Sequence, residues 1–364
     1  MEQYSGEKRV FICKGCGGEA SFDIESQAFC CPNCGREEAL DTDSEVKEYD
    51  FRGDIPKPDE QWSDATHVVV CDSCGAQMVV EAAHTTANCT YCGSSHVLET
   101  RQMAGVRPEA LVPFQIDEHA ARNAVRKWLG KKLFAPRALK NLYQRDRLTA
   151  VYAPYWTFDA DAAATYTAQG GRVYYVTVGS GENRRQVRRV RWTPVRGSLS
   201  RFFDDILVSA RKERDPLAPP PQGFATKACV PFSLAYLSGF HAEKYTISAQ
   251  EAFPEAKNAM ESVLRDMARR EVLSRYDQIS GLNLNAKLFN VKFKHILLPL
   301  WMSGFMYGGK SYRVVINGQT GAVKGTYPKS RVRVGVAVAL CIALAAVLIW
   351  YVLSEGDAPA ALYW

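Results

Sequence analysis

Eight of the 11 cysteines fall into two sets with the same spacing, and this repeat limits the possible folds more than any other feature of the chain. Each set reads CxxC-x14-CxxC, and the second set begins 58 positions after the first. A glycine follows every CxxC pair, which lets the backbone turn tightly beneath a tetrahedral metal ion. The spacing therefore predicts two zinc ribbons, each holding one structural Zn²⁺. The predicted ligands are Cys13, Cys16, Cys31, Cys34, Cys71, Cys74, Cys89 and Cys92.

Three alternatives bear on these cysteines. A thioredoxin-like redox site would use one CxxC pair within a βαβ pattern, not two quartets. Cys30 adjoins Cys31 and is a rival ligand, but the spacing of the other pairs favours Cys31. Iron could replace zinc in purified material, although closed sets of four thiolates favour zinc. A closed set also leaves no coordination position for water, so we expect the metal to be structural.

The end of the sequence predicts a membrane anchor. Residues 334–353 contain no charged residue, Asn, Gln or Pro. A helix of that length spans about 30 Å, the thickness of a bilayer core. Basic residues precede the segment, and the positive-inside rule then places residues 1–333 in the cytoplasm. We expect a single-pass protein of the cytoplasmic membrane with residues 354–364 as a short outer tail; a buried core helix is the alternative.

The rest of the chain predicts a multidomain α+β protein with an internal duplication. Val112-Pro113-Phe114 recurs as Val230-Pro231-Phe232, and each string is followed by a helical pattern and then a Pro-x-Trp strand, within 152–156 and 297–301. Turn-forming sequences at 179–183 and 317–321 predict two β-hairpins. Helices are expected at 117–133, 136–148 and 255–276. The predicted units are zinc ribbons 1–40 and 65–104, an acidic mobile linker 41–64, α+β lobes 105–214 and 224–330, and a Pro-rich linker 215–223.

A run of arginines around the first hairpin is a candidate surface for an anionic partner. The residues are Arg184, Arg185, Arg188, Arg189, Arg191 and Arg196. An adjacent membrane favours anionic lipid or an acidic protein over nucleic acid, while the alternating apolar residues also fit a merely solvated strand face. The second ribbon adds no basic surface, because residues 65–100 contain no Lys or Arg. Nucleic-acid binding is therefore the less favoured alternative.

These motifs together resemble a bacterial family. Paired CxxCG ribbons, a VPF and Pro-x-Trp module, an NGQTG hairpin and a C-terminal apolar helix are similar to membrane-anchored, TFIIB-type double zinc-ribbon proteins. Members are often labelled primosomal protein N′ or superfamily II helicase. The resemblance implies partners like phage-shock protein A and SPFH proteins, and a role in membrane stress. It does not extend to a helicase motor, because the sequence contains no pair of RecA-like domains.

The sequence thus predicts a tail-anchored scaffold that recruits proteins at the bilayer and is not an enzyme. The alternative is a zinc-ribbon factor that binds nucleic acid and is linked to replication without a motor of its own. No HExxH or GxSxG motif is present.

Residues 304–311 match GxxxxGK[ST], but a strand pattern follows where a phosphate-binding loop needs a helix. We therefore predict that the detergent-solubilised chain does not bind ATP in equilibrium dialysis. Saturable binding that is abolished in Lys310→Ala would contradict this prediction.

Overall fold

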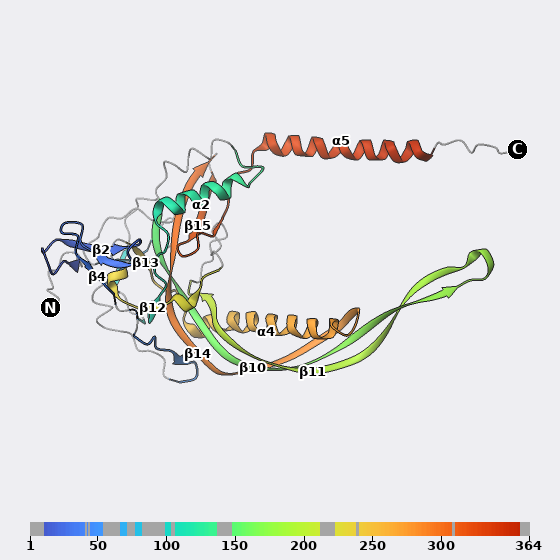
Figure 1. Ribbon diagram of the computed structural model, residues 1–364, viewed down its shortest axis with the longest axis horizontal. Helices are drawn as coiled ribbons and strands as arrows, with labels where there is room; N and C mark the ends of the chain where they lie inside the picture. The colour runs from blue at the N-terminus through green and yellow to red at the C-terminus, as the bar shows by residue number, and fades with distance from the viewer. Residues whose placement is uncertain are drawn as a thin grey trace.

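The computed structural model describes residues 11–40, 42, 44–53, 66–70, 77–81, 99–102, 106–136, 148–211, 223–237, 240–307 and 310–356. Two strands of 30 residues each, β10 (Thr149–Val178) and β14 (Gln278–Tyr307), run antiparallel at the centre of a large sheet. On its other side β10 pairs with β11 (Arg185–Ser209). The inner halves of these strands lie in the body, and their outer halves project from it in Figure 1. We call this projection, residues 160–203 and 278–289, the arm.

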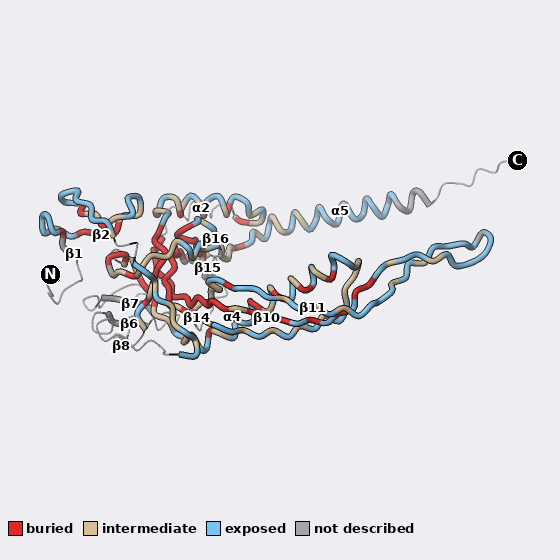
Figure 2. Tube along the Cα trace, turned by 60° about the horizontal axis from the view of Figure 1, so that its bottom comes forward, coloured by how far each residue is buried: buried red, intermediate tan, exposed pale blue. Residues whose placement is uncertain are grey.

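One helix covers the inner part of the arm. Along β10, buried Ala160, Ala162 and Ala164 alternate with more exposed residues, so one face of the strand is apolar. Helix α4 (Ala249–Leu273) packs its buried stripe, which includes Met260 and Leu264, against that face. Small side chains on the strand let the helix approach closely. Figure 2 shows burial fading toward the exposed tip, beyond the end of α4.

Capping fixes where α4 begins. Ser248 and Glu251 form a reciprocal capping box, in which the Ser248 side chain accepts from the Glu251 amide and the Glu251 side chain accepts from the Ser248 amide. The prediction of a start at about Glu255 is therefore wrong, because the capping box starts the helix at Ala249. Pro254 lies near the start of the helix. Helix α2 (Glu118–Gly130), capped by Asp117, confirms the first predicted helix.

The body is a mixed sheet assembled from distant segments. Its strands follow the order β12-β9-β14-β10-β13-β7-β6-β8, with β5, β11, β15 and β16 paired at its sides. The shorter members are β5 (Tyr49–Asp50), β6 (Thr66–Val70), β7 (Gln77–Glu81), β8 (Glu99–Gln102), β9 (Ala110–Leu111), β12 (Val230–Pro231), β13 (His241–Glu243), β15 (Lys310–Asn317) and β16 (Val323–Gly325). A separate four-stranded sheet holds β1 (Phe11–Ile12), β2 (Glu19–Asp23), β3 (Ala28–Cys30) and β4 (Glu37–Glu38).

The strings that suggested a duplication lie beside each other. Pro154 pairs with Leu297 and Tyr152 with Pro299, so the two Pro-x-Trp strings face one another across the β10–β14 ladder. Val230 and Pro231 of the second VPF string pair with Leu111 and Ala110, the two residues before the first string. The halves otherwise differ, since α2 has 13 residues and α4 has 25. The described residues form a sheet-rich α+β fold in which both pairs of strings lie in or next to the large sheet, and the duplication stays a prediction.

The acidic linker is not free where the structure describes it. Within residues 44–53, β5 pairs with β14, and the Phe51 ring lies 4.3 Å from the ring of Phe253 on α4. The prediction of a mobile spacer is therefore wrong for these residues, because its aromatic side chains pack into the core. The predicted helix at 136–148 lies outside the described residues over 137–147, as does the Pro-rich linker over 215–222.

Both predicted hairpins are confirmed. The first is the end of the β10–β11 hairpin, which is far longer than the sequence pattern suggested. In the second, buried Asn317 accepts hydrogen bonds from the amides of Gln319 and Thr320 at 2.8 and 3.0 Å. The GxxxxGK[ST] match spans the end of β14 and the start of β15, where Tyr307 pairs with Lys310. This segment does not open a helix.

Candidate metal centre and basic arm

The first cysteine quartet converges on one point. The Sγ atoms of Cys13, Cys16, Cys31 and Cys34 all lie within 4.8 Å of one another. The Cys13–Cys34 and Cys16–Cys31 sulfur pairs are each 3.5 Å apart. Tetrahedral ligands at a Zn–S distance of about 2.3 Å are about 3.8 Å apart, so this spacing fits a metal of that size. Cys30 lies outside the group, as the spacing predicted.

Two matching turns hold the four thiols. The Gly17 amide donates to the Cys13 carbonyl at 3.0 Å, and the Gly35 amide donates to the Cys31 carbonyl at 2.9 Å. Gly17 and Gly35 have φ values of +72° and +71°, which residues with a Cβ rarely adopt. The Gly15 amide also points at the Cys13 sulfur, 3.4 Å away. Each CxxCG string therefore builds half of the site from local backbone geometry.

The electrostatics of the quartet favour a bound cation. Hydrogen bonds from the Gly15 and Cys16 amides lower the pKa of Cys13 to about 6, and a bond from the Cys34 amide lowers that of Cys31. These thiols are therefore readily converted to the thiolates that bind metals. Cys34 receives a bond from Arg36 that lowers its pKa, but the neighbouring Cys16 and Cys13 raise it to about 12. A divalent cation would relieve this crowding of negative sulfurs.

The ribbon is docked on the body rather than hanging from it. The Phe22 ring on β2 lies 5.0 Å from the ring of Tyr236 and joins the main core cluster. Gln27 Nε2 donates to the Phe114 carbonyl at 2.8 Å. Cys13 and Cys31 pack with Ala235. A metal that orders the ribbon would therefore also support the core beneath it.

The second cysteine quartet lies outside the residues that the structure describes. Its members are Cys71, Cys74, Cys89 and Cys92. The strands that flank the first of its pairs are described, and Val70 of β6 pairs with Gln77 of β7. These strands continue the large sheet through β13. A second zinc ion stays a prediction from the sequence.

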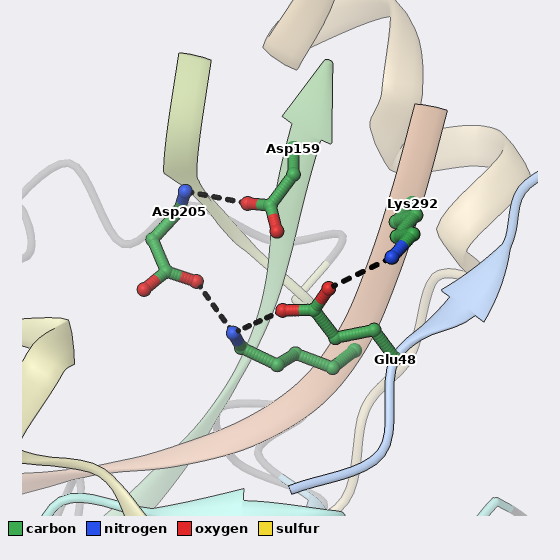
Figure 3. A network of polar contacts seen from close by, with 5 residues as sticks. Glu48, Asp159, Asp205 and Lys292 are labelled. Carbon is green, nitrogen blue, oxygen red and sulfur yellow. Dashed lines mark hydrogen bonds and ion pairs between the residues drawn. The ribbon is translucent and has the colours of Figure 1, made fainter. Parts of the chain in front are cut away.

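Beyond the ribbons, a polar network crosses the sheet where the arm leaves the body (Figure 3). Lys294 Nζ lies 2.9 Å from Glu48 Oε1 and 2.8 Å from Asp205 Oδ1. The Asp205 amide donates to Asp159 Oδ1 at 2.6 Å. Burial is the largest influence on the pKa of Asp159 and raises it to about 6. Ion pairing with Asp205 and Glu48 outweighs burial at Lys294 and raises the pKa of its amine.

This network follows an irregularity shared by the three strands. The register of β10 shifts against β11 between Phe158 and Ala160, and against β14 between Asp159 and Asp161. Carboxylates of Asp159, Asp204 and Asp205 approach one another there, but Lys294 supplies a cation from within the fold. We assign the network a structural role, since β-bulges bend strands and this one lies at the base of the curved arm.

Five of the six predicted arginines lie near the tip of the arm, and Arg196 lies closer to the body, opposite Thr167. All are exposed, and none forms an ion pair with another residue that the structure describes. Register places Arg189 opposite Tyr174 and Arg188 opposite Tyr175. Residues 171–192 contain Arg172, five of the six arginines and only one acid, Glu182, a net charge of +5 from 6 − 1. The tip is thus a basic, aromatic-rich ribbon that reaches away from the body (Figure 1).

The C-terminal apolar segment forms helix α5 (Arg331–Gly356). Its stretch Arg331–Tyr351, 21 residues with a mean hydropathy of 2.7, is long and apolar enough to cross a membrane. None of that stretch is buried within the structure. A soluble core helix would bury an apolar face, so the exposure of this stretch favours the membrane interpretation.

Comparison with known proteins adds one relative. The chain is 28% identical over 246 residues to the uncharacterized protein YdjG of Bacillus subtilis strain 168, which covers 65% of this chain and 69% of that protein. No protein-family model and no solved structure matches the chain.

Sequence reasoning found the cysteines and arginines but missed two features. The ion pair of Glu48 and Lys294 joins positions 246 apart, and no local pattern indicates it. The exposed aromatic residues of the arm were also missed. Tyr and Trp occur among the arginines and apolar residues of 172–178 and 185–192, and this pattern could have predicted an exposed aromatic surface. Tyr175 is 63% exposed and Trp192 is 44% exposed.

We predict that Cys13→Ser lowers the bound metal by one equivalent per chain. Loss of one thiolate opens the quartet and exposes the remaining sulfurs to solvent. Metal content of the purified chain by inductively coupled plasma mass spectrometry measures this change. Cys30→Ser is the matched control, because Cys30 adjoins a predicted ligand without joining the quartet. Equal loss in both variants would contradict the assignment.

The network predicts a pH-dependent effect at Asp159. Its folded pKa of about 6 exceeds the ordinary value of 3.8, so the folded state binds this proton more tightly than the unfolded state. Protonated Asp159 therefore stabilises the fold below about pH 4, and this stabilisation is lost as the pH rises through about 6. Asp159→Asn keeps an oxygen acceptor for the Asp205 amide and removes this loss. The melting temperature of the variant should therefore rise relative to the natural chain between about pH 4 and about pH 7.

Thermal unfolding in detergent at each pH measures this difference. Asp204→Asn, at an exposed neighbouring carboxylate, controls for the change in net charge. A difference for Asp159→Asn that stays constant with pH would contradict the prediction.

Proposed function

We propose that this protein is a membrane-anchored scaffold that binds a structural zinc ion and presents its basic arm to an acidic protein partner at the cytoplasmic face. The observation that carries the proposal is the exposed, basic and aromatic tip of the arm, in a chain whose helix α5 is long and apolar enough to cross a membrane.

The position of the basic residues supports the proposed orientation. Lys324, Lys329, Arg331 and Arg333 precede the apolar segment, and residues 334–353 carry no charge. This asymmetry favours a cytoplasmic body. Zinc is the metal we assign to the first quartet, because four thiolates with tetrahedral spacing are its usual structural site. The same chemistry extends the proposal to the second quartet.

The arm supports a binding role because its arginines, Tyr175 and Trp192 are exposed at the tip. Arg, Tyr and Trp are enriched at protein interfaces. The planar guanidinium of arginine also matches the geometry of carboxylates and phosphates. Arg191 Cζ lies 5.6 Å from the centre of the Tyr174 ring, in a cation–π contact. The Arg191 residue is still exposed to solvent. By resemblance, the partner would be similar to phage-shock protein A or to an SPFH protein, in a response to membrane stress.

The same observation favours a second candidate function. Exposed aromatic rings between arginines also bind single-stranded nucleic acid, through stacking and phosphate contacts. A membrane-proximal location and ribbons poor in basic residues make this the weaker candidate.

We predict that the full chain stays in the membrane pellet after alkaline carbonate extraction. Leu340→Arg with Leu344→Arg should release it, because each charge at the centre of a membrane helix costs about 2.5–3.5 kcal/mol. Val332→Arg is the control, since it lies in the basic flank at the start of α5. Release of the natural chain by carbonate would contradict the anchor.

We further predict that Arg188→Glu with Arg189→Glu lowers recovery of the partner several-fold. The measurement is co-isolation of a phage-shock-protein-A-like or SPFH-like protein from detergent extracts. Arg265→Glu with Arg269→Glu makes the same charge change at exposed positions on α4 and should leave recovery unchanged. Unaltered recovery in the arm variant would contradict the proposal. Salt-sensitive binding of an oligonucleotide, lost in the arm variant, would favour the second candidate.

A further inference from the structure

The first turn of α5 is tied to the loop that follows α2. The Ser330 amide donates to the Phe134 carbonyl at 2.8 Å. Arg333 Nη1 donates to the carbonyls of Leu133 and Ala135 at 3.0 and 2.7 Å. We call residues 131–135 the juxtamembrane loop. Three hydrogen bonds hold it beside the point where the apolar segment begins, and Figure 1 shows α5 starting next to the end of α2.

This loop exposes an apolar side chain. Leu133 is 81% exposed, a larger fraction than any large hydrophobic residue described in α5 itself. A single exposed leucine needs no explanation on an ordinary surface. Here the leucine is held against the first turn of a helix that suits a bilayer. Its exposure therefore places an apolar group at the expected level of the lipid surface.

The two segments that meet at the loop are basic. Residues 123–135 and 320–354 contain no Asp or Glu. Their eight bases are Arg126, Lys127, Lys131, Lys132, Lys324, Lys329, Arg331 and Arg333. A ninth base, Arg122, is already paired with Glu118. Phosphates of an anionic leaflet attract such a cluster of bases.

Two aromatic rings complete the surface. The rings of Trp128 on α2 and Tyr327 before α5 meet edge to face, with centres 5.7 Å apart. Lys132 Nζ lies 4.9 Å from the first ring centre and 5.6 Å from the second. Both rings are half-buried. Amphipathic rings beside lysine are the usual composition of a membrane interface.

We propose that the juxtamembrane loop is a second membrane contact, in which Leu133 enters the boundary between headgroups and acyl chains and the surrounding bases bind anionic headgroups. The contact rests on the proposed function, because it requires α5 to span the bilayer. It adds that the body meets the membrane through the loop that follows α2, as well as through α5. An anionic bilayer is the occupant because apolar, aromatic and basic groups coincide there.

The test places a photoreactive benzoylphenylalanine at one position of the full chain. Positions 133, 344 and 273 are compared: the loop, the middle of α5, and an exposed leucine at the end of α4. The chain is reconstituted in vesicles of phosphatidylcholine, with and without phosphatidylglycerol, irradiated, and analysed by mass spectrometry for lipid adducts. Lys131→Gln with Lys132→Gln is examined in the chain that carries the probe at position 133.

We expect lipid adducts at positions 133 and 344 and none at 273. The adduct at 133 should be stronger on vesicles with phosphatidylglycerol, and the two glutamines should abolish that increase. An adduct at 344 without one at 133 would overturn the contact while leaving the anchor intact. No adduct at 344 would overturn the anchor and the contact together. Crosslinks from 133 to a second protein chain in place of lipid, or an adduct at 133 that ignores the lipid charge, would also overturn the proposal.

Discussion

Pairing of β10 with β14 is the interaction on which the rest of the structure depends. Each strand has 30 residues, and their ladder joins a buried inner half to an exposed outer half. Backbone polar groups of a projecting arm must be paired, and a continuous antiparallel ladder pairs them without a surrounding core. α4 adds the apolar contact that covers one face of the inner arm, and β11 extends the ladder to the basic tip.

Side-chain packing, strand pairing and hydrogen bonds attach the remaining segments to this ladder. The ribbon docks through Phe22, the segment 44–53 pairs with β14, and α5 is held through Arg333. The polar network at Lys294 lies where all three strands lose register, so ion pairs replace apolar packing at the base of the arm. The cysteine quartet, helix α5 and the arm are thereby all attached to the body that this sheet forms.

Short-range signals in the sequence predicted the structure well. The first pair of CxxCG strings and the Asn317 turn each depend on residues a few positions apart, and each is found as expected. Long-range features escaped prediction. Residues 150–160 are buried on both faces of the sheet, so their pattern shows no alternation that would reveal the length of β10. The acidic composition of 44–53 suggested a spacer, because nothing local indicates that Glu48 meets Lys294 or that Phe51 enters the core.

The central claim is that the body and its arm face the cytoplasm while α5 crosses the membrane. Protease accessibility of the arm in sealed vesicles of opposite orientation tests it most directly. Trypsin should cleave within the arginine-rich tip, residues 184–196, in inside-out vesicles and leave it intact in right-side-out vesicles. Cleavage of the tip in right-side-out vesicles, with the membrane still sealed, would contradict the account.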